Sequence, residues 1–465
     1  MIITIITIVF ILSATFIAFT KPKLLYFLLI FFASWYSLFI DIGLQISIYR
    51  LIIIIFLFCL PVYLSLRKNA IKFPSTAKYL LIFVCYAVAV TLMARFFVPE
   101  SRIAGFTRGE GRWIFQIVML FISVTPVFLP LLFLKKIEDI KTVAKVFIIS
   151  TVILCILGWI QSLAFYFYRA IIFPVYSGGL TSGIMKVIDI NLFGMTFHRM
   201  HSLGGEPKHF AATVVVALLL LIIFRMIYRK GSRFENLLIG FFLISLFMSF
   251  ATSGFYIFFM GLILLIILSL FVKSLKFKFA FKSIAFLVTA VIIFFSIIIS
   301  SGILSSDLLK KAVIERTIGR SPIEVFDAAT LGFLANQPQY GLFGVGIGNV
   351  HLYAKEYLSE WGRSLAYNDV FVPNSGYLRM ISEMGIVGLI LFLFVYLIPI
   401  HFNFKYRRRI HDERIKSILL SLNIFAIFIL IAYLMRAQLI NYVFITLGLL
   451  YFLNYKITAR DKHTS

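Results

Sequence analysis

Apolar runs of about 20 residues recur along almost the whole chain, and they constrain its fold more than any other feature of the sequence. A helix of that length spans the hydrocarbon core of a bilayer, which is about 30 Å thick. We therefore predict an all-α polytopic membrane protein with about 12 to 13 transmembrane helices. The predicted spans are 1–19, 25–42, 48–66, 78–97, 113–134, 143–166, 209–228, 236–251, 254–272, 282–301, 380–400, 416–435 and 438–455.

Composition agrees with this fold class. Hydrophobic residues make up 62% of the 465 positions and charged residues only 14%, whereas soluble domains are about 45–50% apolar. The formal net charge of +25 comes mostly from short Lys and Arg clusters between the apolar runs. That placement is typical of membrane proteins, so we expect membrane lipid rather than nucleic acid as a partner.

The two sides of the predicted membrane protein differ in basic residues. Short loops and the C-terminal tail on one side hold 27 of the 44 Lys and Arg residues, although the loops on the other side are longer. The positive-inside rule makes the Lys- and Arg-rich side cytoplasmic. We expect a multi-pass protein of the inner (cytoplasmic) membrane with its N-terminus outside and its C-terminus in the cytoplasm.

Three segments organise the predicted chain. Residues 1–301 hold the first ten helices, 302–379 form a large extracytoplasmic loop, and 380–465 hold the last helices and the tail. Shorter extracytoplasmic loops are 98–112 and 167–208. The large loop includes an amphipathic segment from Ile323 to Leu334 and several Gly turns, so we expect it to be folded.

Several classes of chemistry have no support in the sequence. There is no Walker A motif, no HExxH, no CxxC and no Asp-x-Asp pair, so we expect no metal, no cofactor and no nucleotide chemistry. The first 19 residues lack a basic n-region and a small-residue cleavage site, which favours a retained first span over a signal peptide. All three cysteines lie inside apolar runs, so we expect no disulfide: Cys59, Cys85 and Cys155.

Arginines dominate the basic residues on the predicted outer side, and several lie close to span ends. Guanidinium groups bind phosphate oxygens through two parallel hydrogen bonds, which suits an anionic lipid-linked ligand. Pairing with outer acids or contact with lipid headgroups is the alternative for any one of them. The candidate binding arginines are Arg102, Arg108, Arg112, Arg199, Arg320 and Arg379.

A second cluster of ionisable residues lies at 198–209, directly before an apolar span. Gly204, Gly205 and Pro207 predict a turn that directs His201 or Glu206 toward the membrane surface. Either side chain is a candidate general base, since a low-dielectric boundary shifts such pKa values. The alternative is an interfacial loop whose histidines face water or headgroups.

Two stretches of the sequence resemble the O-antigen polymerase and O-antigen ligase superfamily. QPQYGLFGVGIGNV at 337–350 and PNSGYLRMISEMGIVGLILF at 373–392 are similar to its glycine turn and to the helix that follows its large loop. RMHSLGGEPKHFA at 199–211 is similar to a segment of bacterial polysaccharide polymerases. The resemblance covers roughly 195–400 and implies a GT-C-like, metal-independent, inverting glycosyltransferase.

The resemblance also implies a substrate and site residues. The donor would be an oligosaccharide linked to undecaprenyl diphosphate, and a chain-length regulator protein would be a possible partner. Arg199 and Arg320 would contact the diphosphate. Three further residues would shape the site: Asn374, Tyr377 and Glu383.

The resemblance favours a polymerase of O-antigen, capsule or exopolysaccharide over a ligase. Ligases that transfer O-antigen to lipopolysaccharide typically have a His just before the Asn, and this chain has Pro373 there. The general base stays open among three catalytic candidates: His201, Glu206 and His351. A ligase remains one alternative, a transporter or flippase of a lipid-linked oligosaccharide is a second, and a scaffolding membrane subunit is a third.

Overall fold

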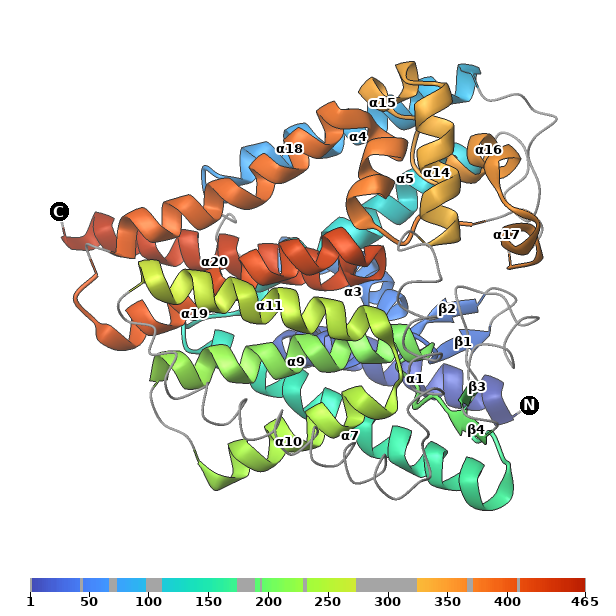
Figure 1. The fold of residues 1–465 in the computed structure, drawn as a ribbon. Coiled ribbons are helices and arrows are strands. Elements are labelled where there is room, and N and C mark those ends of the chain that lie inside the picture. Colours follow the sequence, from blue (N-terminus) through green and yellow to red (C-terminus); the bar gives the residue numbers. More distant parts are fainter. Residues whose placement is uncertain are drawn as a thin grey trace. The chain divides into compact units, whose positions relative to one another are not determined.

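The computed structural model describes residues 2–41, 45–66, 73–97, 111–173, 189–192, 195–228, 232–272, 324–365, 371–407 and 410–464. Within these residues the chain is helical except for two short hairpins and the connecting turns. It divides into two compact units, of which the first contains residues 1–150 and 325–465 and the second contains residues 151–324. The first and last helices of the chain therefore belong to the same unit (Figure 1).

The first unit begins with four long or medium helices and a hairpin. These are α1 (Ile2–Thr20), α2 (Pro22–Phe32), strands β1 (Phe39–Asp41) and β2 (Gln45–Ser47), α3 (Ile48–Leu66) and α4 (Ala77–Phe97). A broken segment follows, made of α5 (Gly111–Val124), the 3-10 turn η2 (Thr125–Val127) and α6 (Leu129–Phe133). Helix α7 (Asp139–Tyr168) then continues from the first unit into the second.

The C-terminal part of the first unit contains short helices followed by three long ones. The short elements are α14 (Val325–Asn336), α15 (Gln339–Phe343), α16 (Val350–Ala354), the 3-10 turn η3 (Lys355–Tyr357) and α17 (Glu360–Leu365). The long helices are α18 (Gly376–Arg407), α19 (Glu413–Met435) and, after the 3-10 turn η4 (Ala437–Leu439), α20 (Ile440–Thr464).

The second unit is a small helical bundle. After the end of α7 it contains the hairpin of β3 (Asp189–Leu192) and β4 (Met195–His198), then α9 (Pro207–Tyr228), α10 (Arg233–Met248) and α11 (Thr252–Phe271). Helix α9 lies between α10 and α11 (Figure 1) and packs against both. Every residue from Phe210 to Ile223 is buried, so α9 forms the core of this unit.

Eight of the described helices are long and apolar enough to cross a membrane, which confirms an all-α polytopic membrane protein. They are α3, α4, α7, α9, α11, α18, α19 and the segment from η4 into α20. The predicted total of about 12 to 13 stays a prediction, because the predicted span 282–301 lies outside the described residues.

Two predicted spans have a different structure from the single helices expected. Helix α2 ends at Phe32, and the β1–β2 hairpin begins at Phe39, so 25–42 is not one continuous helix. Pro126 and Pro130 divide the predicted span 113–134 into α5, η2 and α6. Proline lacks a backbone N–H and clashes with the preceding turn, which explains the break.

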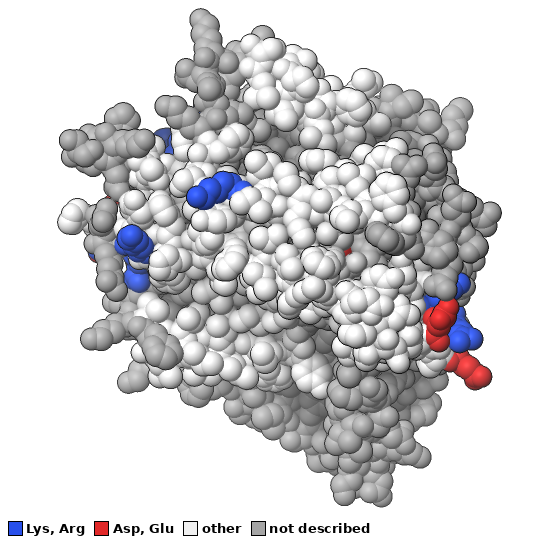
Figure 2. Space-filling view, turned by 90° about the horizontal axis from the view of Figure 1, so that it is seen from above, with Lys and Arg blue, Asp and Glu red and all other residues white. Residues whose placement is uncertain are grey.

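Exposed apolar side chains mark the surface that would contact lipid. Among the described helices, Phe58 on α3 is 80% exposed and Phe96 on α4 is 81% exposed. Figure 2 shows a face of the molecule on which few of the described side chains are charged. Such large apolar exposure suits a hydrocarbon environment rather than water.

Packing around α18 organises the C-terminal part of the first unit. Helix α18 packs against α4, α19 and α20. Phe392 of α18 lies between Phe83 of α4 and Tyr433 of α19, with ring centroids 5.8 and 5.7 Å apart. These aromatic contacts keep the three helices in a constant arrangement.

The described part of the predicted large loop contains short helices joined by turns. Helix α14 covers most of the predicted amphipathic segment. Helices α14 and α16 share an apolar cluster that is separate from the long helices and includes Phe333, Val350, Leu352, Ala354 and Phe371. The segment therefore folds as a small helical cap at the start of α18.

Candidate functional site

The start of α18 is held by a carboxylate from another helix. Asp327 of α14 accepts hydrogen bonds from the backbone N–H groups of Asn374 and Ser375 at 2.7 and 3.2 Å. The first N–H groups of a helix have no partner within it, and an acidic side chain there is favourable. The Ser375 hydroxyl also donates to the carbonyl of Leu434 at 2.6 Å, which ties this start to the end of α19.

Helix α18 is interrupted at Gly385, whose φ of 68° and ψ of 178° are not helical. The interruption frees the carbonyls of Ser382 and Glu383, which accept hydrogen bonds from Val345 and Gly346 N–H, each at 2.9 Å. A Cβ at Gly385 would lie 2.0 Å from the carbonyl oxygen of Leu342. The structure thus brings together the glycine turn after α15 and the Glu383–Gly385 segment, which lie side by side in Figure 1.

An ion pair lies just before this break. Arg379 Nε is 3.1 Å from Glu383 Oε1, one helical turn away, and the Glu383 side chain is almost completely buried while that of Arg379 is partly exposed. Tyr433 of α19 interacts electrostatically with both charges. The Tyr377 and Tyr433 rings are 6.3 Å apart, so two aromatic faces accompany the pair.

A second arginine joins from the end of α19. Arg436 is 3% exposed, and its Nη1 donates to the Asn374 side-chain oxygen at 3.4 Å. The backbone carbonyl of Asn374 accepts from Ala437 N–H at 2.6 Å. We call Asn374, Tyr377, Arg379, Glu383 and Arg436 the α18 site. Four of these five side chains were predicted as binding residues, and Arg436 was not among the predicted residues.

One further arginine was not singled out in the sequence. Arg50, in the first turn of α3, is exposed, and the charge of Arg379 lies near enough to act on it. Arg50 lies on the predicted outer side of its span, and that was the only sequence signal that pointed to it. It had no partner motif, so nothing distinguished it from a lipid-facing arginine.

His351 lies close to this part of the fold but within a packed helix. It is 6% exposed on α16, the helix that follows the Gly344–Gly348 turn. That turn has positive φ at each of its glycines. A Cβ at Gly344 would lie 2.4 Å from the backbone of Glu383, so the turn requires glycine there to approach α18.

The second ionisable cluster belongs to the second unit, and its histidines are buried. The His198 ring stacks on Phe165 with centroids 4.5 Å apart and meets the His201 ring at 4.9 Å. Burial lowers the pKa of His198 from 6.5 to about 4. His201 is fully buried, and its ring nitrogens lie 3.3 Å from the carbonyl oxygens of Arg199 and Phe173.

Glu206, the other catalytic candidate of this cluster, has a cationic neighbour. Its carboxylate is 3.1 Å from Lys208 Nζ. Its backbone carbonyl accepts from His209 and Phe210 N–H at 2.8 and 3.0 Å, which forms the first turn of α9. Arg199 is intermediate in exposure. The cluster is therefore a compact connection between β4 and α9.

The side chains of the other four predicted arginines lie outside the described residues. Arg102, Arg108 and Arg320 lie outside the described residues, and Arg112 lies in α5 with its side chain outside them. In the part of the chain that the structure describes, no group of three or more His, Cys, Asp or Glu side chains could hold a metal ion.

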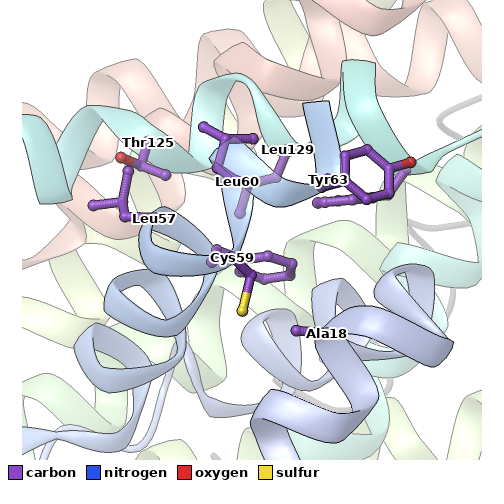
Figure 3. Close-up of a pocket in the computed structure, with 9 residues that line it drawn as sticks. Ala18, Leu57, Cys59, Leu60, Tyr63, Thr125 and Leu129 are labelled. Atoms are coloured by element: carbon purple, nitrogen blue, oxygen red, sulfur yellow. The ribbon is translucent and has the colours of Figure 1, made fainter. Parts of the chain in front are cut away.

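A small apolar pocket lies elsewhere in the first unit (Figure 3). Helices α1, α3 and α6 form it with η2, and its lining includes Ala18, Cys59, Tyr63, Thr125 and Leu129. None of its lining residues is charged. Its chemistry suits an aliphatic chain and differs from that of the α18 site.

The eight apolar helices define a polytopic membrane protein, and the α18 site places two arginines and one glutamate near the start of α18. Comparisons of the chain with protein-family models and with curated protein sequences gave no match. The function must therefore be argued from the chemistry of the site.

Proposed function

We propose that this protein is a polysaccharide polymerase that transfers a glycan from a polyprenyl-diphosphate carrier to a lipid-linked repeat unit. The reaction would take place at the extracytoplasmic face of the bacterial inner membrane. The observation that carries the proposal is the α18 site, where Arg379 and Arg436 accompany one buried acid, Glu383.

The guanidinium groups of the site support an anionic ligand. Arg379 is paired with Glu383, and Arg436 donates to the Asn374 side-chain oxygen. Charges at the edge of a hydrocarbon layer are costly unless they are compensated, so arginines kept there favour a negatively charged partner. A diphosphate at the membrane surface has that charge and the oxygen geometry that guanidinium groups bind.

The aromatic residues at the same site support a sugar. Tyr377 and Tyr433 lie next to the Arg379–Glu383 pair, with their rings 6.3 Å apart. An aromatic face offers apolar contact area, and its hydroxyl provides a hydrogen-bond partner. A ligand with a diphosphate and a sugar would match both chemistries of the site.

The proposed reaction is a substitution at the anomeric carbon of the donor. The acceptor hydroxyl oxygen forms the new glycosidic bond, and the bond between the anomeric carbon and the diphosphate oxygen breaks. The electron pair of that bond stays on the diphosphate, where the arginines stabilise the developing charge. The hydroxyl proton passes to a general base.

The structural positions of the base candidates differ. Both ring nitrogens of His201 are close to backbone carbonyls, which favours a structural role. Glu206 and His351 remain the proposed candidates for the base. Glu383 is bound to Arg379, so we assign it the role of holding that arginine in position.

A transporter of the same lipid-linked anion is the second candidate, because α18 is interrupted at Gly385. Broken helices near the membrane midplane are typical of secondary transporters. The break in α18, however, comes only nine residues after its first residue, near one end of a 32-residue helix. That position favours a site at the membrane surface.

A reconstituted assay tests the proposal. The purified protein in liposomes is supplied with polyprenyl-diphosphate-linked repeat units, without metal or nucleotide, and products are separated on a gel. A ladder of lengthening lipid-linked glycans is the expected result. Movement of unextended substrate between leaflets, with no ladder, would establish the transporter instead.

A further inference from the structure

Helix α15 and the glycine turn after it pack beside α4. The Ile347 N–H donates to the Thr91 hydroxyl at 3.3 Å, and a Cβ at Gly346 would lie 2.7 Å from the Cβ of Ala94. Thr91 and Ala94 belong to the last turn of Ala77–Ala94, the stretch of α4 that is apolar enough to cross a membrane. The glycine turn therefore lies beside the apolar length of α4, although its sequence falls in the predicted extracytoplasmic loop.

The same segment packs beside the apolar length of α18. Gly385 leaves no room for a Cβ next to the carbonyl of Leu342 on α15. From Gly385 to Ile400, α18 has no charged residue. The Tyr86 hydroxyl donates to the Met384 carbonyl at 2.9 Å, and Tyr86 lies near the middle of α4. Helix α15 is thus held at a level where both neighbouring helices are apolar.

Protein groups satisfy the backbone of the glycine turn. The Gly344 N–H donates to the Tyr340 carbonyl at 2.8 Å, and the next two N–H groups donate to carbonyls of α18. The Ile347 N–H uses the Thr91 hydroxyl. Four consecutive N–H groups therefore have acceptors within the protein. Non-helical backbone is tolerated at membrane depth where protein groups satisfy it in this way.

The exposed side chains of α15 include large apolar ones. Leu342 is 47% exposed and Phe343 is 57% exposed. No Asp, Glu, Lys or Arg occurs between Asp327 and Lys355. Figure 2 views the side on which α4 and α18 lie in Figure 1, and few of the described side chains there are charged. Both neighbouring helices also expose large apolar side chains: Met93 and Phe96 on α4, and Ile386 and Ile390 on α18.

Another part of the cap has a different surface. The 3-10 turn η3 and helix α17 expose Glu356, Glu360 and Arg363, as expected of a surface in water. An exposed Leu and Phe without charged neighbours in the sequence suit the apolar part of a lipid leaflet instead.

We propose that α15 lies within the leaflet that contains the start of α18, with Leu342 and Phe343 in contact with lipid acyl chains. Under the predicted orientation this is the outer leaflet, so the predicted loop 302–379 re-enters the membrane at α15. Embedding α15 holds the Glu383–Gly385 segment at a fixed depth, because the two segments pack together. This inference does not depend on the proposed reaction.

Spin labels test the proposal. The variants Leu342→Cys and Phe343→Cys are made in full-length protein whose three native cysteines are replaced by alanine, labelled with a nitroxide and reconstituted in phosphatidylcholine liposomes. Glu360→Cys on α17 is the control for a water-facing position of the cap, and Ile390→Cys on α18 is the lipid-facing reference. Collisions of each nitroxide with oxygen, which dissolves in lipid, are compared with collisions with a water-soluble nickel chelate.

The ratio of oxygen to nickel collisions at positions 342 and 343 is expected to be severalfold higher than at 360 and close to that at 390. A ratio equal to that at 360 would overturn the proposal, because α15 would then face water. Few collisions with either reagent would also overturn it, because another protein surface would then cover α15.

A second measurement needs no substitution. The wild-type protein is irradiated in liposomes that contain phosphatidylcholine with a diazirine on its acyl chain, and mass spectrometry locates the labelled residues. Label is expected on α15 and on α18 after Gly385, and not on α17. Label on α18 without label on α15 would refute the proposal even if the cysteine-free variants do not fold.

Discussion

The α18 site in the first unit and the 198–209 loop in the second unit look alike in the sequence and differ in the structure. Both contain several ionisable residues beside glycine turns and directly before an apolar helix. In the loop, His198 and His201 are buried against rings and backbone carbonyls, and Glu206 is beside Lys208. At the α18 site, by contrast, Arg379 is paired with Glu383, and Arg436 from the end of α19 donates to the Asn374 side chain.

This difference shows that the density of ionisable residues does not identify a ligand site. What matters is whether neighbouring groups already compensate each charge. In the 198–209 loop the histidines are enclosed by rings and backbone carbonyls, which favours a structural role for them. The α18 site instead brings guanidinium groups from two helices to the start of α18, and we propose it as the site that binds an anion.

The largest effect is expected from arginine substitutions at the α18 site. Arg379→Gln or Arg436→Gln should lower the rate of glycan extension by about 10² to 10³, as for other groups that stabilise developing charge. His201→Gln should change the rate by less than about tenfold in protein that remains folded. Rates are measured in the liposome assay, with Arg363→Gln as control. The opposite order would make the 198–209 loop the reaction centre.

The second-largest effect is expected on the free energy of unfolding when Glu383, the acid of the α18 site, is replaced. Glu383→Gln leaves Arg379 without its carboxylate, and we expect the free energy of unfolding to fall by about 2 to 3 kcal/mol, less than for a fully buried pair because Arg379 is partly exposed. The double variant Arg379→Gln/Glu383→Gln should recover part of this loss. Unfolding in detergent is followed by circular dichroism. Glu206→Gln is the matched change in the second unit and should cost a similar amount, because Glu206 is also buried and Lys208 is also partly exposed.

The 198–209 loop should make stability depend on pH. The pKa of His198 is lowered to about 4 in the folded protein, whereas an unfolded histidine titrates near 6.5. The unfolded chain therefore binds the proton first, and stability should fall as the pH drops from about 6.5 to about 4, by about 3 kcal/mol. Unfolding temperatures measured across this range should show the slope in the wild type but not in His198→Phe. The same slope in both proteins would assign it to other groups.

The smallest difference concerns how helices in the two units begin. Asp327 caps α18 from another helix, whereas Ser232 caps α10 from the adjacent position and forms a reciprocal pair with Glu235. Asp327→Ala should cost about 1 to 2 kcal/mol and Ser232→Ala about 1 kcal/mol. Only Asp327→Ala should also weaken diphosphate binding, because it loosens the start of α18. Equal effects of both variants on binding would argue against that link.

Hydropathy was sufficient to predict the class of the protein and most of its long helices. The spans predicted at 143–166, 209–228 and 416–435 lie within α7, α9 and α19. Membrane spans were predicted less well where an apolar run of sequence contains a turn of the backbone. The run at 25–42 is as apolar as a span, but its helix ends at Phe32, since hydropathy records composition and not where the backbone turns.

Site residues were predictable only where they were close together in the sequence. Asn374, Tyr377, Arg379 and Glu383 lie within ten residues of one another; the family resemblance pointed to the first two and Glu383, and the predicted outer position pointed to Arg379. Arg50 precedes them by more than 300 positions and belongs to no motif. Its relation to Arg379 appears only in the folded protein.

The sequence alone determines that this chain enters a membrane, because the length and hydropathy of its runs follow from local composition and the thickness of the bilayer. It also determines where glycine is placed, including Gly344 and Gly385. The tertiary structure decides which helix ends meet, and thereby brings Arg436 at the end of α19 to Asn374 before α18. Hydropathy alone does not decide which helices are neighbours in a lipid environment, because lipid contacts all apolar helices equally well. Close packing and specific hydrogen bonds select the neighbours, and those contacts are made between residues far apart in the chain.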